Sequence, residues 1–233
     1  MAKDFKGSGK SELRSGEYSD IKLSGKTSGS GEIKALSLTA SGKTDINGDL
    51  IIEKSVCVSG KTVVGNLKCR SFEGSGKLDV KNTLECTDKV KFIGAIHAKN
   101  INTEKCELSI SSYSNVDKIE STELVVRKTD NKQLSKLKDG LTDTKVDINI
   151  FGLKFKHDFG DLDLSGLSET VSKDAVLDAQ NIVAKSVDVS STNAGCIVAD
   201  DVTIGVNCHI KCVKYSNTYT CDGSSIVDSV EKS

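Results

Sequence analysis

The chain has 233 residues, of which 36% are hydrophobic and 28% are charged, and this composition excludes an intrinsically disordered protein. Its 32 basic and 33 acidic residues leave a formal net charge of −1, which argues against a nucleic-acid binder that works through a global basic field. Aromatic residues make up only 4% and Pro and Trp are missing, so Val, Ile and Leu have to fill the core, which favours strands. No stretch approaches the roughly 20 apolar residues of a membrane span, and the first residues lack the apolar run of a secretion signal. We therefore expect a cytoplasmic protein.

Residues 1–8 are predicted to be a polar N-terminal tail, and a repeat begins directly after them. The tripeptide Gly-Lys-Ser/Thr occurs at residues 9–11, 25–27, 42–44 and 60–62, and Gly76-Lys77-Leu78 is a degenerate fifth copy. The copies are 16, 17, 18 and 16 residues apart, with short alternating apolar runs between them. This period is shorter than that of helical repeats, about 33–47 residues, or of propeller blades, about 40–50 residues. It suits one coil of a β-solenoid, so residues 9–126 are predicted to form roughly seven stacked coils.

The same tripeptide also ends the phosphate-binding loop of nucleotide hydrolases. That loop needs another Gly five positions before the second Gly. The four copies carry Asp4, Asp20, Ser37 and Ser55 there, so all of them fail. The sequence excludes this kind of nucleotide site, and we expect no cofactor.

Residues 127–172 interrupt the repeat and are predicted to be an insertion, in which a loop or short helix precedes a β-hairpin. The segment 132–140 is polar, whereas 146–150 and 153–156 alternate around Phe151-Gly152 as hairpin strands do. The segment 161–166 resembles a calcium loop, but Ser172 stands where the final Glu is required. The repeat resumes in residues 173–230, which are predicted to form about three further coils.

Eight cysteines raise the question of a metal site, although no Cys-x-x-Cys pair occurs. Several cysteines lie within alternating apolar runs and are interpreted as small buried hydrophobic residues. One cluster could ligate zinc and stays open as a weak alternative: Cys208, His209, Cys212 and Cys221. In a strand, however, His209 faces away from its two flanking cysteines, so we expect no metal site.

The Ser-Gly-Lys coils of residues 24–78 and the run 202–210, followed by Val213-Lys214-Tyr215, resemble the bactofilins, especially the longer Gram-positive members. Bactofilins are bacterial polymer-forming cytoskeletal proteins. The resemblance implies an all-β, right-handed parallel β-helix whose subunits stack end to end into nonpolar filaments without nucleotide. It implies a non-enzymatic scaffold that binds other copies of the same chain. It also implies a location in the cytoplasm or at the inner face of the membrane, where membrane or cell-wall proteins could join the scaffold. The chain differs from short members in its insertion and in lacking proline-rich tails.

The solenoid fold gives an independent reason to expect self-assembly. An uncapped terminal coil exposes unpaired backbone N–H and C=O groups and the apolar interior of the solenoid. If like ends pair, each junction is isologous and the polymer has no polarity. The alternative is that the apolar residues at the ends only close their own coils. The candidate self-assembly residues are Leu13, Tyr18, Ile21 and Leu23 at one end, and Tyr215, Tyr219, Ile226 and Val230 at the other.

Two rival functions use related folds. A hexapeptide-repeat acyltransferase would fit the run 202–210, but residues 24–78 lack a six-residue rhythm, and each possible catalytic base, His97, His157 or His209, stands apart from any supporting motif. A carbohydrate-binding adhesin or polysaccharide lyase is the second rival. An adhesin needs export, and a lyase needs clustered basic residues, whereas the arginines at 14, 70 and 127 are far apart. We therefore expect no catalytic residues.

Overall fold

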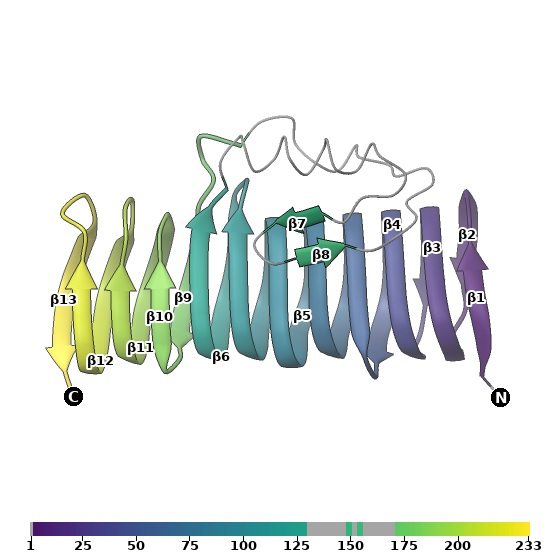
Figure 1. Ribbon diagram of the computed structural model, residues 1–233, viewed down its shortest axis with the longest axis horizontal. Helices are drawn as coiled ribbons and strands as arrows, with labels where there is room; N and C mark the ends of the chain where they lie inside the picture. The colour runs from purple at the N-terminus through teal and green to yellow at the C-terminus, as the bar shows by residue number, and fades with distance from the viewer. Residues whose placement is uncertain (1, 130–147, 151–152, 156–170) are drawn as a thin grey trace.

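The computed structural model describes residues 2–129, 148–150, 153–155 and 171–233. Its described part contains strands and no helix, and the strands wind into a single β-solenoid of about 11 coils (Figure 1). The period of about 17 residues per coil confirms the predicted fold class. The two termini lie at opposite ends of the column.

The strands are long because most of them continue around the corners of the solenoid. β5 alone extends through several coils. The first part of the solenoid contains β1 (Lys3–Gly7), β2 (Lys10–Leu13), β3 (Gly16–Ser30), β4 (Ile33–Ile52), β5 (Ser55–Ile110) and β6 (Ser114–Lys128). The second part contains β9 (Leu177–Val183), β10 (Ser186–Val189), β11 (Thr192–Ile204), β12 (His209–Cys221) and β13 (Ile226–Lys232). Between them, β7 (Ile148–Ile150) and β8 (Leu153–Phe155) pair antiparallel as the predicted hairpin.

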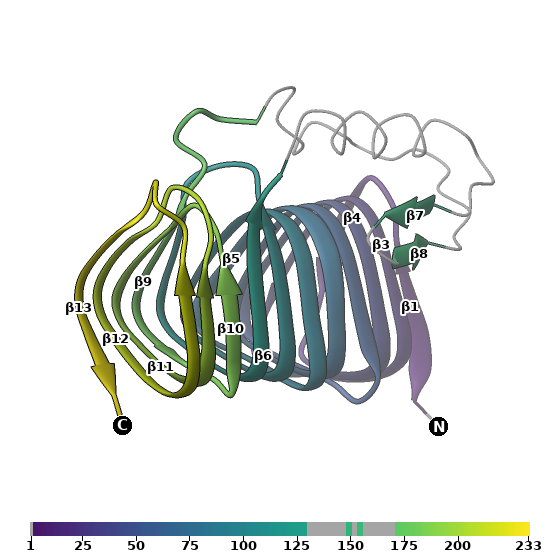
Figure 2. The same ribbon diagram turned by 60° about the vertical axis from the view of Figure 1, so that its left-hand side comes forward.

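All strand pairs of the solenoid are parallel, and each residue pairs with the residue one coil away. Gly25 pairs with Gly42, for example, and Leu50 pairs with Leu67. Since side chains alternate between the two faces of a strand, every second residue points inward and meets its counterpart in the next coil. The resulting inner columns of Val, Ile, Leu and Ala form one continuous core along the solenoid. Figure 2 shows the stacked coils that enclose it.

The recurring glycine occupies a corner that other residues fit poorly. Gly25, Gly42, Gly60 and Gly76 have φ between +88° and +103°, a backbone conformation that is costly for residues with a Cβ atom. A Cβ at Gly42 would lie only 2.4 Å from the carbonyl oxygen of Gly25 in the preceding coil. The corner therefore needs glycine both for its backbone conformation and for the close approach of neighbouring coils.

The coils on either side of residues 127–172 stack directly on each other. β9 and β10 both pair with β6, so the column is continuous across this segment. Arg127 of β6 forms an ion pair with Asp188 of β10 and donates a hydrogen bond to the backbone oxygen of Asp188 at 2.9 Å. The predicted polar segment 132–140 and the calcium-like segment 161–166 lie outside the described residues.

One predicted boundary was wrong. Residues 1–8 were expected to be a polar tail, but Lys3–Gly7 form β1 and pair with β3. The reason is that Phe5 and Gly7 fall one coil before Ile21 and Leu23 and so continue their inner columns. Among the described residues there is no helix long and apolar enough to cross a membrane.

Candidate assembly surfaces

Both ends of the solenoid present strand edges. Within the described residues, β13 pairs only with β12, whereas β1 and β2 pair only with β3. Each terminal strand therefore has one side whose N–H and C=O groups lack a strand partner. Such edges can accept a strand of another chain.

At the C-terminal end of the solenoid, side chains of the apolar core are accessible to solvent. Val213 of β12 is fully buried, but Val230, which continues the same inner column in β13, is 45% exposed. Val227 follows the buried Ile210 in the neighbouring column and is only half-buried. The last coil thus presents inward-type side chains that no further coil of the described residues covers.

Two tyrosines of β12 lie at this end of the solenoid. The rings of Tyr215 and Tyr219 stack with centroids 5.5 Å apart, and Lys232 Nζ lies 5.8 Å from the centroid of the Tyr215 ring. Burial, together with a hydrogen bond to Cys221, raises the pKa of Tyr219 to about 12, so this hydroxyl stays protonated at neutral pH. Ile226, the remaining predicted residue, points outward and is 60% exposed. The four C-terminal candidates therefore lie in the last two strands, and all are at least partly accessible.

The N-terminal end is more closed. Leu13, Ile21 and Leu23 are buried within the single chain, so of the four predicted residues here only Tyr18 is accessible. Its ring packs edge-on against Phe5 with centroids 5.8 Å apart, and its hydroxyl donates to the backbone oxygen of Arg14 at 2.8 Å. Phe5 was missed because residues 1–8 were interpreted as a tail. Its position 16 residues before Ile21 was the signal that could have identified it.

The four candidate zinc ligands do not converge. Cys208 is buried inside the solenoid, whereas His209 points outward and its Nε2 lies 3.5 Å from Asp228 Oδ1. Cys212 pairs in register with Cys196 on the adjacent coil, and Cys221 is exposed. In the part of the chain that the structure describes, no three His, Cys, Asp or Glu side chains come close enough to hold a metal ion.

The candidate histidines lie in separate places. His97 Nδ1 is 3.0 Å from Asp79 Oδ1 of the preceding coil, and partial burial lowers the pKa of His97 against the opposing effect of this carboxylate. The sequence analysis missed this pair because the two residues are one coil apart. His209 instead lines a shallow groove of about 370 Å³ with Asn115, Asp178 and Asn193, and His97 does not line this groove. His157 lies outside the described residues.

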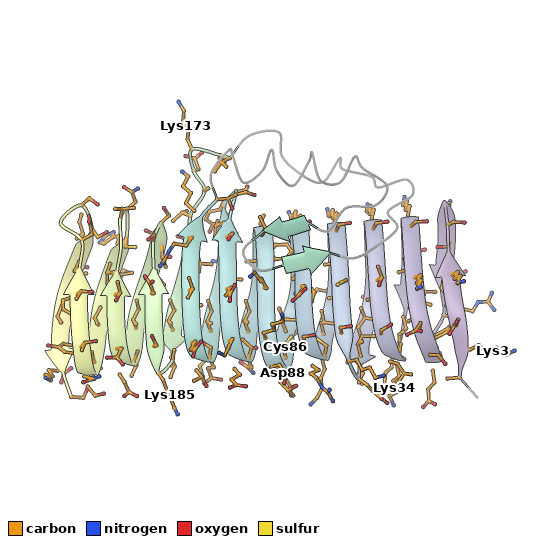
Figure 3. All side chains as sticks on the ribbon, in the orientation of Figure 1. Lys3, Lys34, Cys86, Asp88, Lys173 and Lys185 are labelled. Carbon is orange, nitrogen blue, oxygen red and sulfur yellow. The ribbon has the colours of Figure 1, made fainter. Side chains whose placement is uncertain are left out.

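No protein-family model, curated protein or solved structure matches this chain. Its side faces are lined with charged side chains such as Lys34, Asp88 and Lys185 (Figure 3), which leaves the ends as the places where the core is accessible.

Proposed function

We propose that this chain is a non-enzymatic, bactofilin-like scaffold that assembles with itself through the ends of its solenoid, without nucleotide. The observation that carries the proposal is the uncovered last coil, where Val230 is 45% exposed in a column whose other members are buried. Stacking a second chain on this end would continue the inner columns and pair the free edge of β13. We place this scaffold in the cytoplasm, including the inner face of the membrane, where membrane or cell-wall proteins could join it.

We propose that the junctions join like ends. The C-terminal end offers Val227, Val230 and the edge of β13, whereas the N-terminal end offers the Phe5–Tyr18 pair and the edges of β1 and β2. Pairing of like ends gives isologous junctions with two-fold symmetry. A polymer built in this way has no polarity and needs both kinds of junction.

Electron microscopy of negatively stained full-length protein, with light scattering in parallel, tests the proposal. We expect filaments without nucleotide, and we expect Val230→Lys to abolish them. Val198→Lys is the matched control because Val198 is 41% exposed but lies on a side face, in β11. This control should still form filaments.

The oligomeric state of the Val230→Lys variant also shows whether the wild-type filament is polar or nonpolar. Like-end assembly predicts dimers joined through their N-terminal ends, whereas head-to-tail assembly would leave monomers. A wild-type protein that is uniformly monomeric, or equal loss of assembly in both variants, would overturn the proposal.

A further inference from the structure

The repeated lysine of the Gly-Lys-Ser/Thr motif forms a row along one corner of the solenoid. Lys10 pairs in register with Lys26, Lys26 with Lys43, and Lys43 with Lys61. Lys77 continues the row because Gly76 lies directly against Gly60. We call these five residues the lysine ladder. At the strand spacing of about 4.8 Å they extend over about 19 Å along the solenoid axis.

The ladder differs from several other lysines on the outer surface. Lys68–Glu85 at 2.8 Å, Lys105–Glu123 at 3.3 Å and Lys214–Glu231 at 3.1 Å are ion pairs between adjacent coils, whereas Lys6 and Lys22 are a second, shorter stack of like charge. In the ladder only Lys77 has an acidic partner among the described residues, Asp79 at 3.7 Å. The ladder therefore concentrates positive charge over five adjacent coils, with one ion pair among the described residues.

The acidic residues nearest in sequence do not neutralise the row. Glu12, Asp45 and Asp79 follow two residues after Lys10, Lys43 and Lys77 on the same outer face, and only Asp79 approaches its lysine within ion-pair distance. On the other side of each glycine stands an uncharged serine. Among the described residues, Lys10, Lys26, Lys43 and Lys61 of this row thus form no ion pair, and only Lys77 at its end does so.

The fold itself does not require these lysines. In the sixth coil the corner glycine is Gly94, and the residue after it is Ala95, which fits the same place. Lys10, Lys26 and Lys43 are exposed to solvent. Their repetition across five coils is therefore a surface property and points to a ligand with regularly spaced negative charges.

We propose that the lysine ladder binds an extended, linear polyanion with repeating phosphate or carboxylate groups, aligned with the solenoid axis. The side chains alone make the contact, because the backbone amide of Lys26 already donates to Gly9 O at 2.7 Å and so cannot cradle a phosphate. A single-stranded nucleic acid is a poorer fit, because its binding sites add aromatic rings for base stacking, and the ladder has none. This surface lies on the side of the solenoid and is separate from the two ends.

Binding of long-chain inorganic polyphosphate to the full chain, measured by fluorescence anisotropy across a series of salt concentrations, tests the proposal. The variant K26Q/K43Q/K61Q should bind at least about tenfold more weakly and show a shallower salt dependence, since three charge contacts are lost. The matched control is K68Q/K105Q/K214Q, which removes the same charge from lysines that pair with glutamate, and it should bind like the wild type.

Three outcomes would overturn the proposal. These are no binding of polyphosphate by the wild type, equal weakening in both triple variants, and tighter binding to oligo(dT) or to phosphatidylserine vesicles than to polyphosphate. Circular dichroism of the two variants excludes a loss of folding as the cause of weaker binding. A ladder variant that unfolds would be replaced by the single substitution K43Q, for which we expect about a twofold to fivefold loss.

Discussion

Replacing Gly42 by alanine tests whether the glycine corners determine the stacking of coils. Gly42 has a φ of +88°, and a Cβ there would lie 2.4 Å from Gly25 O. The backbone conformation costs about 1–2 kcal/mol for a residue with a Cβ, and relief of the clash costs about 1–3 kcal/mol. Lower entropy of the unfolded chain offsets about 0.4–1 kcal/mol. We therefore expect Gly42→Ala to lower the free energy of unfolding by about 1–5 kcal/mol, with a central value of about 3 kcal/mol.

Two other glycines separate the two contributions. Gly9 has a φ of +63°, but no atom lies within 4 Å of the position that a Cβ would take. Gly9→Ala should therefore lower the free energy of unfolding only through the strained backbone conformation, by about 1 kcal/mol once the lower entropy of the unfolded chain is included. Gly65 is not among the glycines with positive φ, but its Cβ would lie 2.5 Å from Gly48 O. Gly65→Ala therefore carries the clash alone, about 1–2 kcal/mol.

Urea unfolding followed by far-UV circular dichroism measures these differences. The three variants should have the same m-value as the wild type, which is the slope of the unfolding free energy against urea concentration. A shift of the urea midpoint then measures a change in stability. If Gly42→Ala destabilises the protein no more than Gly9→Ala, the close approach of coils at this corner does not limit the choice of residue, and the argument fails.

Three further predictions concern single side chains. Arg127→Ala should lower the free energy of unfolding in urea by about 1 kcal/mol, because the half-exposed ion pair with Asp188 and the hydrogen bond to the Asp188 backbone oxygen join the coils on either side of residues 127–172; an unchanged midpoint would contradict this. Burial lowers the pKa of His97, so the unfolded chain binds its proton more readily, and stability that is complete above pH 6.5 should decline as the pH falls below it. His97→Gln should reduce this decline, and an identical pH profile in the variant would refute the assignment. In a brief iodoacetamide pulse followed by mass spectrometry, the exposed Cys221 should be labelled first, whereas Cys106, whose pKa burial raises to about 12, should react only after unfolding; early labelling of Cys106 would show that this coil opens.

At the ends of the solenoid, the sequence pattern alone does not predict which apolar side chains are exposed. Leu13, Ile21 and Leu23 were predicted to be end residues because they lie early in the chain, yet they are buried. Ile21 and Leu23 pair with Phe5 and Gly7 of β1, and Leu13 pairs with Gly29 of β3, and these pairings form only once the first coils have stacked. At the other end, Val213 and Val230 are the same residue type in the same column, and they differ in exposure because β13 covers Val213 whereas no described strand covers Val230.

The sequence by itself determined the fold class, because a 17-residue period with glycines at a fixed position specifies coils and corners through local backbone conformation and alternation. It also determined the hairpin at β7 and β8 through strict alternation around Phe151-Gly152. Only the tertiary structure decided which side chains meet across coils, such as Lys26 with Lys43 or His97 with Asp79, because those contacts depend on register. A shift of one residue in register reverses every side chain between core and surface, so register is settled by the packing of the whole column.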